Sequence, residues 1–118
     1  MQQVEIYRFD IINDIISKRK YTRYLEIGFQ QGICYNAVNC DFKMAVDPSP
    51  VNTNCDNLYL GTSDDFFAQN QINFDIGFID GLHTYEAVSE DFRNWYPKVK
   101  PGGVVIFHDI QARMMDFG

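Results

Sequence analysis

The chain is poor in the residues that build metal clusters, disulfide frameworks and membrane spans. Its 118 residues include three cysteines, two histidines and one tryptophan. The cysteines form no C-x-x-C pair, which argues against a zinc site or a set of disulfides and favours a reducing, cytoplasmic compartment. No apolar run approaches the ~20 residues that a membrane-spanning helix needs, and no signal-peptide pattern opens the chain.

Positive charge is also scarce. Lysine and arginine total 10 against 16 aspartates and glutamates, which gives a formal net charge of -6. A nucleic-acid backbone requires clustered basic residues, and the one basic cluster, residues 17–23, is more typical of a helix C-terminus. We therefore expect a small-molecule partner, with no nucleic acid and no membrane. The length fits one domain that can bury its own core.

The pattern of apolar segments predicts an α/β fold. Isoleucines at helical spacing predict a first amphipathic helix over residues 10–20, with Asp10 capping its start. Ser63 is expected to cap a later helix in the same way. Near-continuous apolar strands separated by helical patterns are typical of a parallel sheet covered on both faces. Strands are predicted at residues 23–29, 43–47, 57–63, 74–80 and 104–109, and further helices at residues 32–39, 63–70 and 84–96.

Polar residues gather where these predicted strands end. In open α/β sheets, ligands bind beyond the carboxyl ends of the strands, near the point where the strand order reverses. A binding site is therefore expected at this edge. The residues concerned are Glu26 and Gly28, Asp47, Ser63 and Asp64, Asp80, and His108 with Asp109.

The stretch LEIGFQQG brackets the first strand-to-helix turn with Gly28 and Gly32. Glycines there let backbone N–H groups approach a ligand, although ordinary turns also use glycine. Gln30 stands where a dinucleotide motif would have its middle glycine, which disfavours a pyrophosphate. The Glu26 carboxylate would repel a pyrophosphate but could accept a hydrogen bond from an amine, or order the loop.

Asp47 ends the second predicted strand about 20 residues after Gly28, where a ribose-binding carboxylate is expected in a nucleotide-binding sheet. A carboxylate can accept hydrogen bonds from both hydroxyls of a ribose diol. The alternative is structural, because Asp47 followed by Pro48 is also a typical start of a turn.

The motifs together resemble one family. YLEIGFQQG, AVDPSP, GTSDDFF, FDIGFIDGLHTYEAVSEDF and VKPGGVVIFHD have the order and spacing of class I S-adenosylmethionine-dependent methyltransferases. The chain is most similar to the branch with IDG-x-H-x-Y and HD motifs, which includes sugar and natural-product O-methyltransferases. The resemblance covers residues 21–110. It implies a Rossmann-like three-layer sandwich with a mostly parallel sheet, truncated after the fifth strand.

The resemblance also implies roles for the residues at the strand ends, within one domain made of an N-terminal helix (1–20), a core (21–110) and a tail (111–118). Glu26, Gly28 and Gly32 would surround the methionine part of S-adenosylmethionine. Asp80 would lie near the sulfonium, where its charge favours the cationic cofactor over the neutral product. Asp47 would hold the ribose, and Ser63 and Asp64 would lie beside the adenine.

A divalent metal is a further implication of the resemblance, because metal-assisted relatives hold Mg²⁺ with carboxylates at the ends of the fourth and fifth strands. Asp80 and Asp109 match those positions, but Ile110 stands where some relatives place an amide. An ion there would lower the pKa of an acceptor hydroxyl.

His83 and His108 are candidates for the base that removes a proton from that hydroxyl, since an imidazole titrates near neutrality. Each histidine has a structural alternative. His83 could stabilise a helix start, and His108 could satisfy backbone groups.

Beyond the fifth strand the family fold is expected to continue with another helix and two strands, whereas the chain stops at residue 118. We therefore expect either a homodimer across the exposed edge of that strand or a tail that masks it. A strict monomer in light scattering at high concentration would count against the dimer.

The predicted function is methylation of a hydroxyl on a small polar metabolite or sugar. One alternative is a cofactor-binding module without transfer activity. Only the methyltransferase hypothesis predicts methyl transfer that is lost in Asp109→Ala or His108→Ala. The other alternative is a nicotinamide-dependent oxidoreductase with the same sheet, which Glu26 and the missing glycine disfavour.

Overall fold

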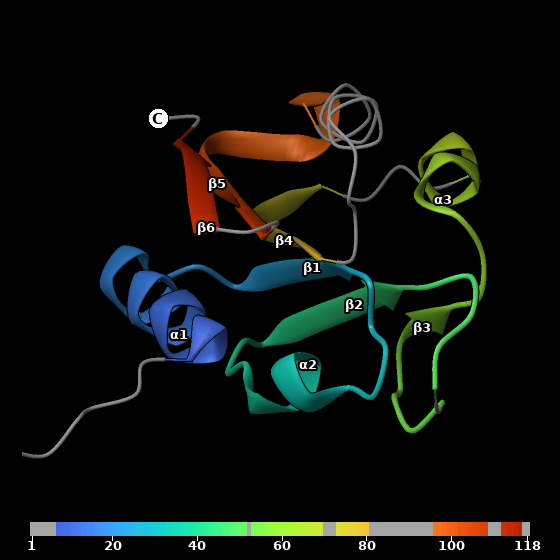
Figure 1. Ribbon diagram of the computed structural model, residues 1–118. Coiled ribbons are helices and arrows are strands. Elements are labelled where there is room, and N and C mark those ends of the chain that lie inside the picture. The colour runs from blue at the N-terminus through green and yellow to red at the C-terminus, as the bar shows by residue number, and fades with distance from the viewer. Residues whose placement is uncertain (1–6, 52, 70–72, 81–95, 109–111, 117–118) are drawn as a thin grey trace, which may run out of the picture.

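The computed structural model describes residues 7–51, 53–69, 73–80, 96–108 and 112–116 (Figure 1). Helices and strands alternate along most of this part of the chain, as the apolar pattern predicts. The elements are α1 (Arg8–Arg19), β1 (Arg23–Ile27), α2 (Ile33–Ala37), β2 (Phe42–Val46), β3 (Leu58–Tyr59), α3 (Ser63–Gln69), β4 (Phe74–Asp80), a 3₁₀ turn (Tyr96–Lys98), β5 (Val99–His108) and β6 (Ala112–Asp116). None of the helices in these ranges has the length and apolar character needed to cross a membrane.

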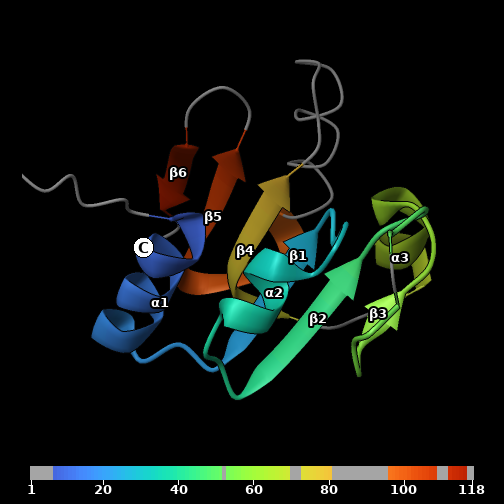
Figure 2. The ribbon, with the colours of Figure 1, turned by 60° about the horizontal axis from the view of Figure 1, so that its bottom comes forward.

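The six strands form one sheet in the order β3-β2-β1-β4-β5-β6. Strands β1 to β5 run parallel to one another, and β6 is antiparallel to β5. Figure 2 shows this directly, because the arrows of β2, β4 and β5 point one way and that of β6 points back. The strand order reverses between β1 and β4, so the switch point of a Rossmann-like sheet lies there. The predicted fold class is confirmed.

Helices cover both faces of the sheet, with α1 and α2 on one side and α3 on the other (Figure 1). Alternation along β1 divides its side chains between the two cores. Tyr24 packs in the core beneath α1 and α2, whereas Leu25 and Ile27 pack with Phe66 of α3. Because Glu26 lies two residues after Tyr24, its carboxylate points to the α1 and α2 side.

The cap of α1 differs from the prediction, because Tyr7 occupies the cap position, whereas the helix begins at Arg8 and includes Asp10. The Asp10 carboxylate lies in the first turn and accepts a hydrogen bond from the backbone N–H of Tyr7, with 3.0 Å between nitrogen and oxygen. This is the reciprocal half of a capping box, and it satisfies a donor that the helix leaves unpaired. At the other end, Lys18 and Arg19 occupy the last turn, where positive charge is favourable.

The cap of α3 differs from the prediction. Ser63 is the first residue of the helix itself, and Thr62 provides the cap. The Thr62 hydroxyl accepts from the N–H of Asp65 at 3.1 Å, and the Thr62 carbonyl accepts from the N–H of Phe66 at 3.0 Å. Thr62 and Ser63 are both good capping residues, so local sequence alone could not decide between them.

The C-terminal tail extends the sheet by one strand. Residues Ala112–Asp116 pair with β5 along its last five positions and mask its edge, as one of the two expectations stated. The sequence had suggested a sheet that ends with the fifth strand, so β6 is an addition to it. An ion pair of 2.8 Å between Arg19 and Asp116 connects the end of α1 to β6. The homodimer stays a prediction.

Two neighbouring glycines before the second half of β5 differ sharply in their surroundings, and they supply a test of the β4–β5 register. A Cβ atom on Gly103 would lie 2.5 Å from the carbonyl oxygen of Asp75, whereas one on Gly102 would meet nothing within 4 Å. We expect Gly103→Ala to lower the free energy of unfolding by about 3 kcal/mol, because backbone atoms of β4 cannot move aside. Gly102→Ala should cost only about 1 kcal/mol, from its positive φ of 85°. Urea denaturation of both variants measures the difference, and equal losses would contradict this register.

Candidate functional site

Three of the residues predicted to form the site stand at one edge of the sheet. Glu26 is the penultimate residue of β1, Asp47 directly follows β2, and Asp80 is the last residue of β4. These three strands are neighbours and parallel, and Glu26 pairs in register with Ala45 of β2 and Phe78 of β4. The switch point between β1 and β4 lies at the centre of this edge.

The end of β5 adjoins the same edge. His108 is the last residue of β5, and it is the register partner of Asp80. The strands therefore bring these two predicted positions together, although they are distant in sequence. His83 and Asp109, the other two predicted catalytic residues, lie outside the described residues. Their roles stay predictions.

Asp47 is held tightly by backbone groups. Its side chain belongs to a residue only 7% exposed, Oδ2 accepts from the N–H of Gln30, and Oδ1 accepts from the N–H of Ser49, each at 2.8 Å. The bond to Ser49 is the turn that the structural alternative predicted. A carboxylate has about four acceptor positions, so two bonds leave room for two ribose hydroxyls. The turn and the ribose role are therefore compatible.

The loop after β1 contains three residues with left-handed backbone: Gly28 at a φ of 95°, Gln30 at 53° and Gly32 at 84°. A Cβ atom on Gly32 would lie 2.6 Å from the Phe29 ring, so this turn requires glycine for space as well as for conformation. Gln30 stands at the position of the middle glycine of a dinucleotide motif and has a left-handed backbone without being glycine. Its N–H donates to Asp47, and its carbonyl accepts from the N–H of Val51 at 3.0 Å.

Gln30 also belongs to the site. In the sequence it indicated only that the middle glycine of a dinucleotide motif is absent. Its backbone joins the β1–α2 loop to the segment after β2 through the two hydrogen bonds to Asp47 and Val51. The separation of 17 residues between Gln30 and Asp47 hides this bond in the sequence. No local signal could have found it.

Glu26 is almost fully buried, with 1% of its surface exposed. The hydroxyl of Tyr24 donates to Glu26 Oε1 at 2.6 Å. Burial, and then the Glu26 charge, raise the pKa of Tyr24 well above its usual value. The same two causes, in the same order, raise the pKa of the Cys34 thiol. Tyr24 and Cys34 were not predicted as site residues; the available signal was the two-residue spacing of Tyr24 and Glu26 on one strand.

Ser63 and Asp64 lie in the first turn of α3. The backbone just before this turn is linked to Asp47, because Asp47 donates to the carbonyl of Tyr59 at 3.1 Å and accepts from the N–H of Gly61 at 3.2 Å. Ser63 is half-buried and Asp64 is exposed. Both predicted residues therefore lie a few residues after the segment that is hydrogen-bonded to Asp47.

The described ranges contain no group of three or more His, Cys, Asp or Glu side chains that could hold a metal ion. The predicted ligand pair includes Asp109, which lies outside those ranges. The metal site therefore stays a prediction.

A polar cavity of about 300 Å³ lies away from the strand ends. Its lining includes Tyr35 and Asn36 of α2, Lys43 near the start of β2, and residues 54–57 before β3. The Lys43 ammonium donates to two backbone carbonyls, those of Tyr35 at 2.8 Å and Val38 at 3.0 Å, and so caps the C-terminal end of α2. None of the predicted site residues lines this cavity, and we do not assign the cofactor to it.

Comparison with known proteins decides the family. A family model described as a methyltransferase domain matches residues 25–110, which include both buried carboxylates and the ends of β1 to β5. The chain belongs to this methyltransferase family. A curated relative, the uncharacterized protein y4gI of Sinorhizobium fredii, is 48% identical over 44 residues, which are 37% of this chain and 5% of that protein.

Solved structures with the same fold include methyltransferases for different acceptors. The O-methyltransferase TomG of Streptomyces achromogenes, solved with S-adenosylmethionine, has a TM-score of 0.70 at 18% identity over 89% of this chain and 56% of its own. The N-methyltransferase NodS of Bradyrhizobium japonicum has a TM-score of 0.66 at 16% identity, over 85% of this chain and 65% of its own. MycE, a mycinamycin-pathway methyltransferase, was solved with Mg, S-adenosylhomocysteine and mycinamycin VI. It has a TM-score of 0.63 at 21% identity, over 84% of this chain and 32% of its own.

These comparisons confirm the class I S-adenosylmethionine-dependent methyltransferase fold that the motifs indicated. The chain spans between about one third and two thirds of the length of these three structures. The family is thus established for this domain, whereas its acceptor is a matter for proposal.

Proposed function

We propose that this domain binds S-adenosylmethionine at the ends of β1, β2 and β4 and transfers its methyl group to a hydroxyl of a small polar metabolite or sugar. One observation carries the proposal. Two buried carboxylates, Glu26 and Asp47, lie on either side of a glycine loop at the switch point of the sheet. Such a rim suits an ammonium, a ribose diol and a sulfonium, and it disfavours a diphosphate.

The proposal gives each residue of the rim one part of the cofactor. Glu26 accepts from the ammonium of the methionine portion, with Gly28 and Gly32 allowing the loop to approach it. Asp47 accepts from the ribose hydroxyls with the acceptor positions that Gln30 and Ser49 leave open. Asp80 contributes negative charge near the sulfonium. Ser63 and Asp64 recognise the adenine, with the Asp64 carboxylate accepting from its exocyclic amine.

When bound, S-adenosylmethionine supplies an electrophilic methyl group on a positively charged sulfur. The acceptor oxygen must lose a proton as its new bond to carbon forms. We assign that proton to His108 at the end of β5, with His83 as a second candidate, because a neutral imidazole is a suitable base near neutral pH. Asp109 follows His108 in the chain and would orient the acceptor.

Divalent metal binding is a separate part of the proposal. The presence of Mg in the MycE complex supports it, since that protein shares this fold. Asp80 and Asp109 would supply carboxylate oxygens, which are the ligands that Mg²⁺ prefers. We further propose a cytoplasmic location, and a homodimer as the form to test by light scattering.

The decisive experiment is calorimetric titration of the domain with S-adenosylhomocysteine, with and without Mg²⁺. We expect saturable binding of one molecule per chain, and no binding of NAD in a parallel titration. Binding of NAD with none of S-adenosylhomocysteine would favour the oxidoreductase alternative and refute the proposal. An affinity that does not change with Mg²⁺ would place the metal outside cofactor binding.

Transfer itself is tested with isotopically labelled S-adenosylmethionine and a panel of sugars, polyols and amines. Labelled product from a hydroxyl compound supports O-methylation. Product from amines alone would move the proposal to N-methylation, the reaction that the printed name of NodS describes. Tight cofactor binding without any product would favour the binding-module alternative.

A further inference from the structure

We propose that Tyr24 is a positioning residue: its hydroxyl fixes the Glu26 carboxylate so that this group can recognise the ammonium of the cofactor. The inference rests on the proposed function and extends it to a residue that does not itself contact the ligand. Tyr24 has no exposed surface and lies in the core beneath α1 and α2, where its hydroxyl is engaged by Glu26.

The geometry of β1 brings the two side chains together. Residues two apart on a strand point to the same face, and the Tyr24 hydroxyl reaches Glu26 Oε1 at 2.6 Å. A hydroxyl that donates to a carboxylate over so short a distance forms a charge-assisted hydrogen bond. Burial strengthens this bond further, because the local dielectric is low. The strand thus carries both the carboxylate and the group that orients it.

The carboxylate also has a neighbour on α2. Cys34 lies in the first turn after the glycine loop, and burial together with the nearby Glu26 carboxyl raises the pKa of its thiol. Because the pKa values of Tyr24 and Cys34 are both raised, the two groups stay protonated near neutral pH. Tyr24 therefore acts as a neutral donor toward Glu26.

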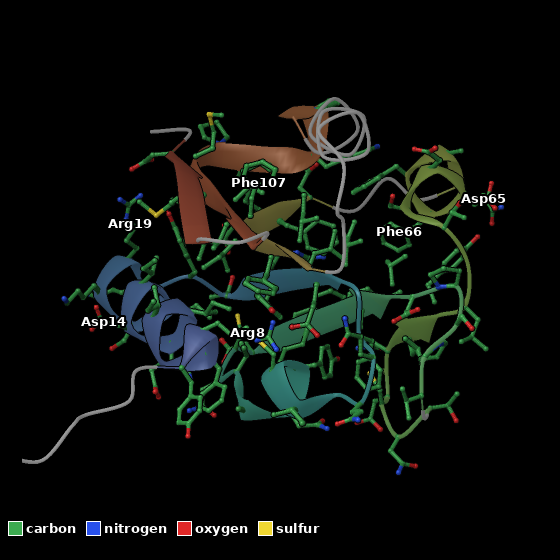
Figure 3. All side chains as sticks on the ribbon, in the orientation of Figure 1. Arg8, Asp14, Arg19, Asp65, Phe66 and Phe107 are labelled. Carbon is green, nitrogen blue, oxygen red and sulfur yellow. The ribbon has the colours of Figure 1, made fainter. Side chains whose placement is uncertain are left out.

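Orientation matters because another cation lies on this face of the sheet. The Arg8 guanidinium lies 5.9 Å from the ring centre of Phe78, the residue beside Glu26 in β4. In Figure 3, Arg8 is seen below β1 in the region of α1 and α2. A carboxylate without the Tyr24 hydrogen bond would be freer to turn toward this charge. The Tyr24 bond therefore favours one direction of the carboxylate.

The test compares two ligands on the Tyr24→Phe variant. S-adenosylhomocysteine carries the ammonium, whereas 5′-methylthioadenosine keeps the adenine, ribose and thioether but lacks the amino-acid portion. We expect Tyr24→Phe to weaken binding of S-adenosylhomocysteine about 10-fold, the scale of one hydrogen bond to a charged group. Binding of 5′-methylthioadenosine should stay unchanged. Equal losses for both ligands would indicate a general structural effect and overturn the inference.

Tyr35→Phe is the matched control. Tyr35 lies in the same core and is also buried, but its hydroxyl donates to the carbonyl of Lys43 at 3.1 Å. This variant loses a partly buried tyrosine hydroxyl that donates to β2 and not to Glu26, and it keeps the aromatic ring. We expect it to bind both ligands as the unchanged protein does, and circular dichroism should show that both variants are folded.

A mutant cycle with Glu26→Gln provides a second readout, which does not depend on the smaller ligand. If Tyr24 acts through Glu26, then Tyr24→Phe should have little further effect on S-adenosylhomocysteine affinity once Glu26 is glutamine. Additive losses would overturn the inference. Failure of the unchanged protein to bind S-adenosylhomocysteine would instead refute the proposed function, so the two failures are distinguishable.

Discussion

Replacement of Asp47 by asparagine is expected to weaken binding of S-adenosylhomocysteine by about 1.5–3 kcal/mol, which is roughly 10- to 150-fold. The carboxylate accepts one backbone N–H on each oxygen, from Gln30 and from Ser49. Asparagine has only one acceptor oxygen, and its NH₂ group would face one of these two N–H donors. The variant therefore loses acceptor positions for the ribose diol and also one of the backbone hydrogen bonds that Asp47 accepts from Gln30 and Ser49. Calorimetric titration measures the change in affinity.

Asp75 supplies the matched control for this prediction. Its Oδ2 accepts from the backbone N–H groups of Thr22 at 2.9 Å and Arg23 at 3.1 Å, so it too clamps two backbone donors. It lies at the beginning of β4, at the opposite end of the sheet from the glycine loop. We expect Asp75→Asn to lower thermal stability and leave the affinity unchanged. An Asp47→Asn variant with the affinity of the unchanged protein would remove Asp47 from the cofactor site.

Replacement of Phe66 by alanine is expected to lower the free energy of unfolding by about 3–5 kcal/mol. Phe66 has no exposed surface, and its ring lies 5.4 Å from the ring centres of Tyr59 and Phe67 and 6.5 Å from that of Phe74. Figure 3 shows it between α3 and the sheet. The variant leaves a cavity where α3 is anchored to β3 and β4. Urea denaturation followed by circular dichroism measures the loss.

Leu60→Ala is the control for Phe66, because Leu60 is also a large apolar residue near α3 but is 62% exposed. We expect it to change the free energy of unfolding by no more than about 0.5 kcal/mol. If alanine at Phe66 prevents folding, Phe66→Leu gives a milder measurement of the same site, with a smaller loss. A loss below about 1 kcal/mol for Phe66→Ala would contradict the packing of α3 described above.

Much of the site could be predicted because the signals are local. Glu26, Asp47 and Asp80 each stand at the end of an apolar run, and the runs are short enough for a strand but too short for a helix. Parallel strands place such ends on one edge, so the placement of these three residues at that edge followed from the strand assignment alone. The alternative readings of Asp47, a turn and a ribose ligand, could not be separated in this way.

The bonds that hold the site could not be predicted, because they join residues whose distance in space the chain does not reveal. Asp47 reaches Gln30 across 17 residues, and Arg19 reaches Asp116 across 97. The pairing of β6 with β5 depends on a short segment with two exposed methionines, Met114 and Met115, which has no strong pattern of alternation. Whether such a segment joins a sheet depends on the free edge beside it.

The amino-acid sequence by itself determined the order of the described strands and helices as far as β5, the glycine loop and the acidic character of the strand ends, because periodicity and turn chemistry act over a few residues. Only the tertiary structure decided that Gln30 takes the left-handed conformation, that Thr62 caps α3 and that Tyr24 holds Glu26. Each of these depends on which donors and acceptors remain unpaired once the sheet has closed around them. Burial then makes the pairing of those groups energetically necessary.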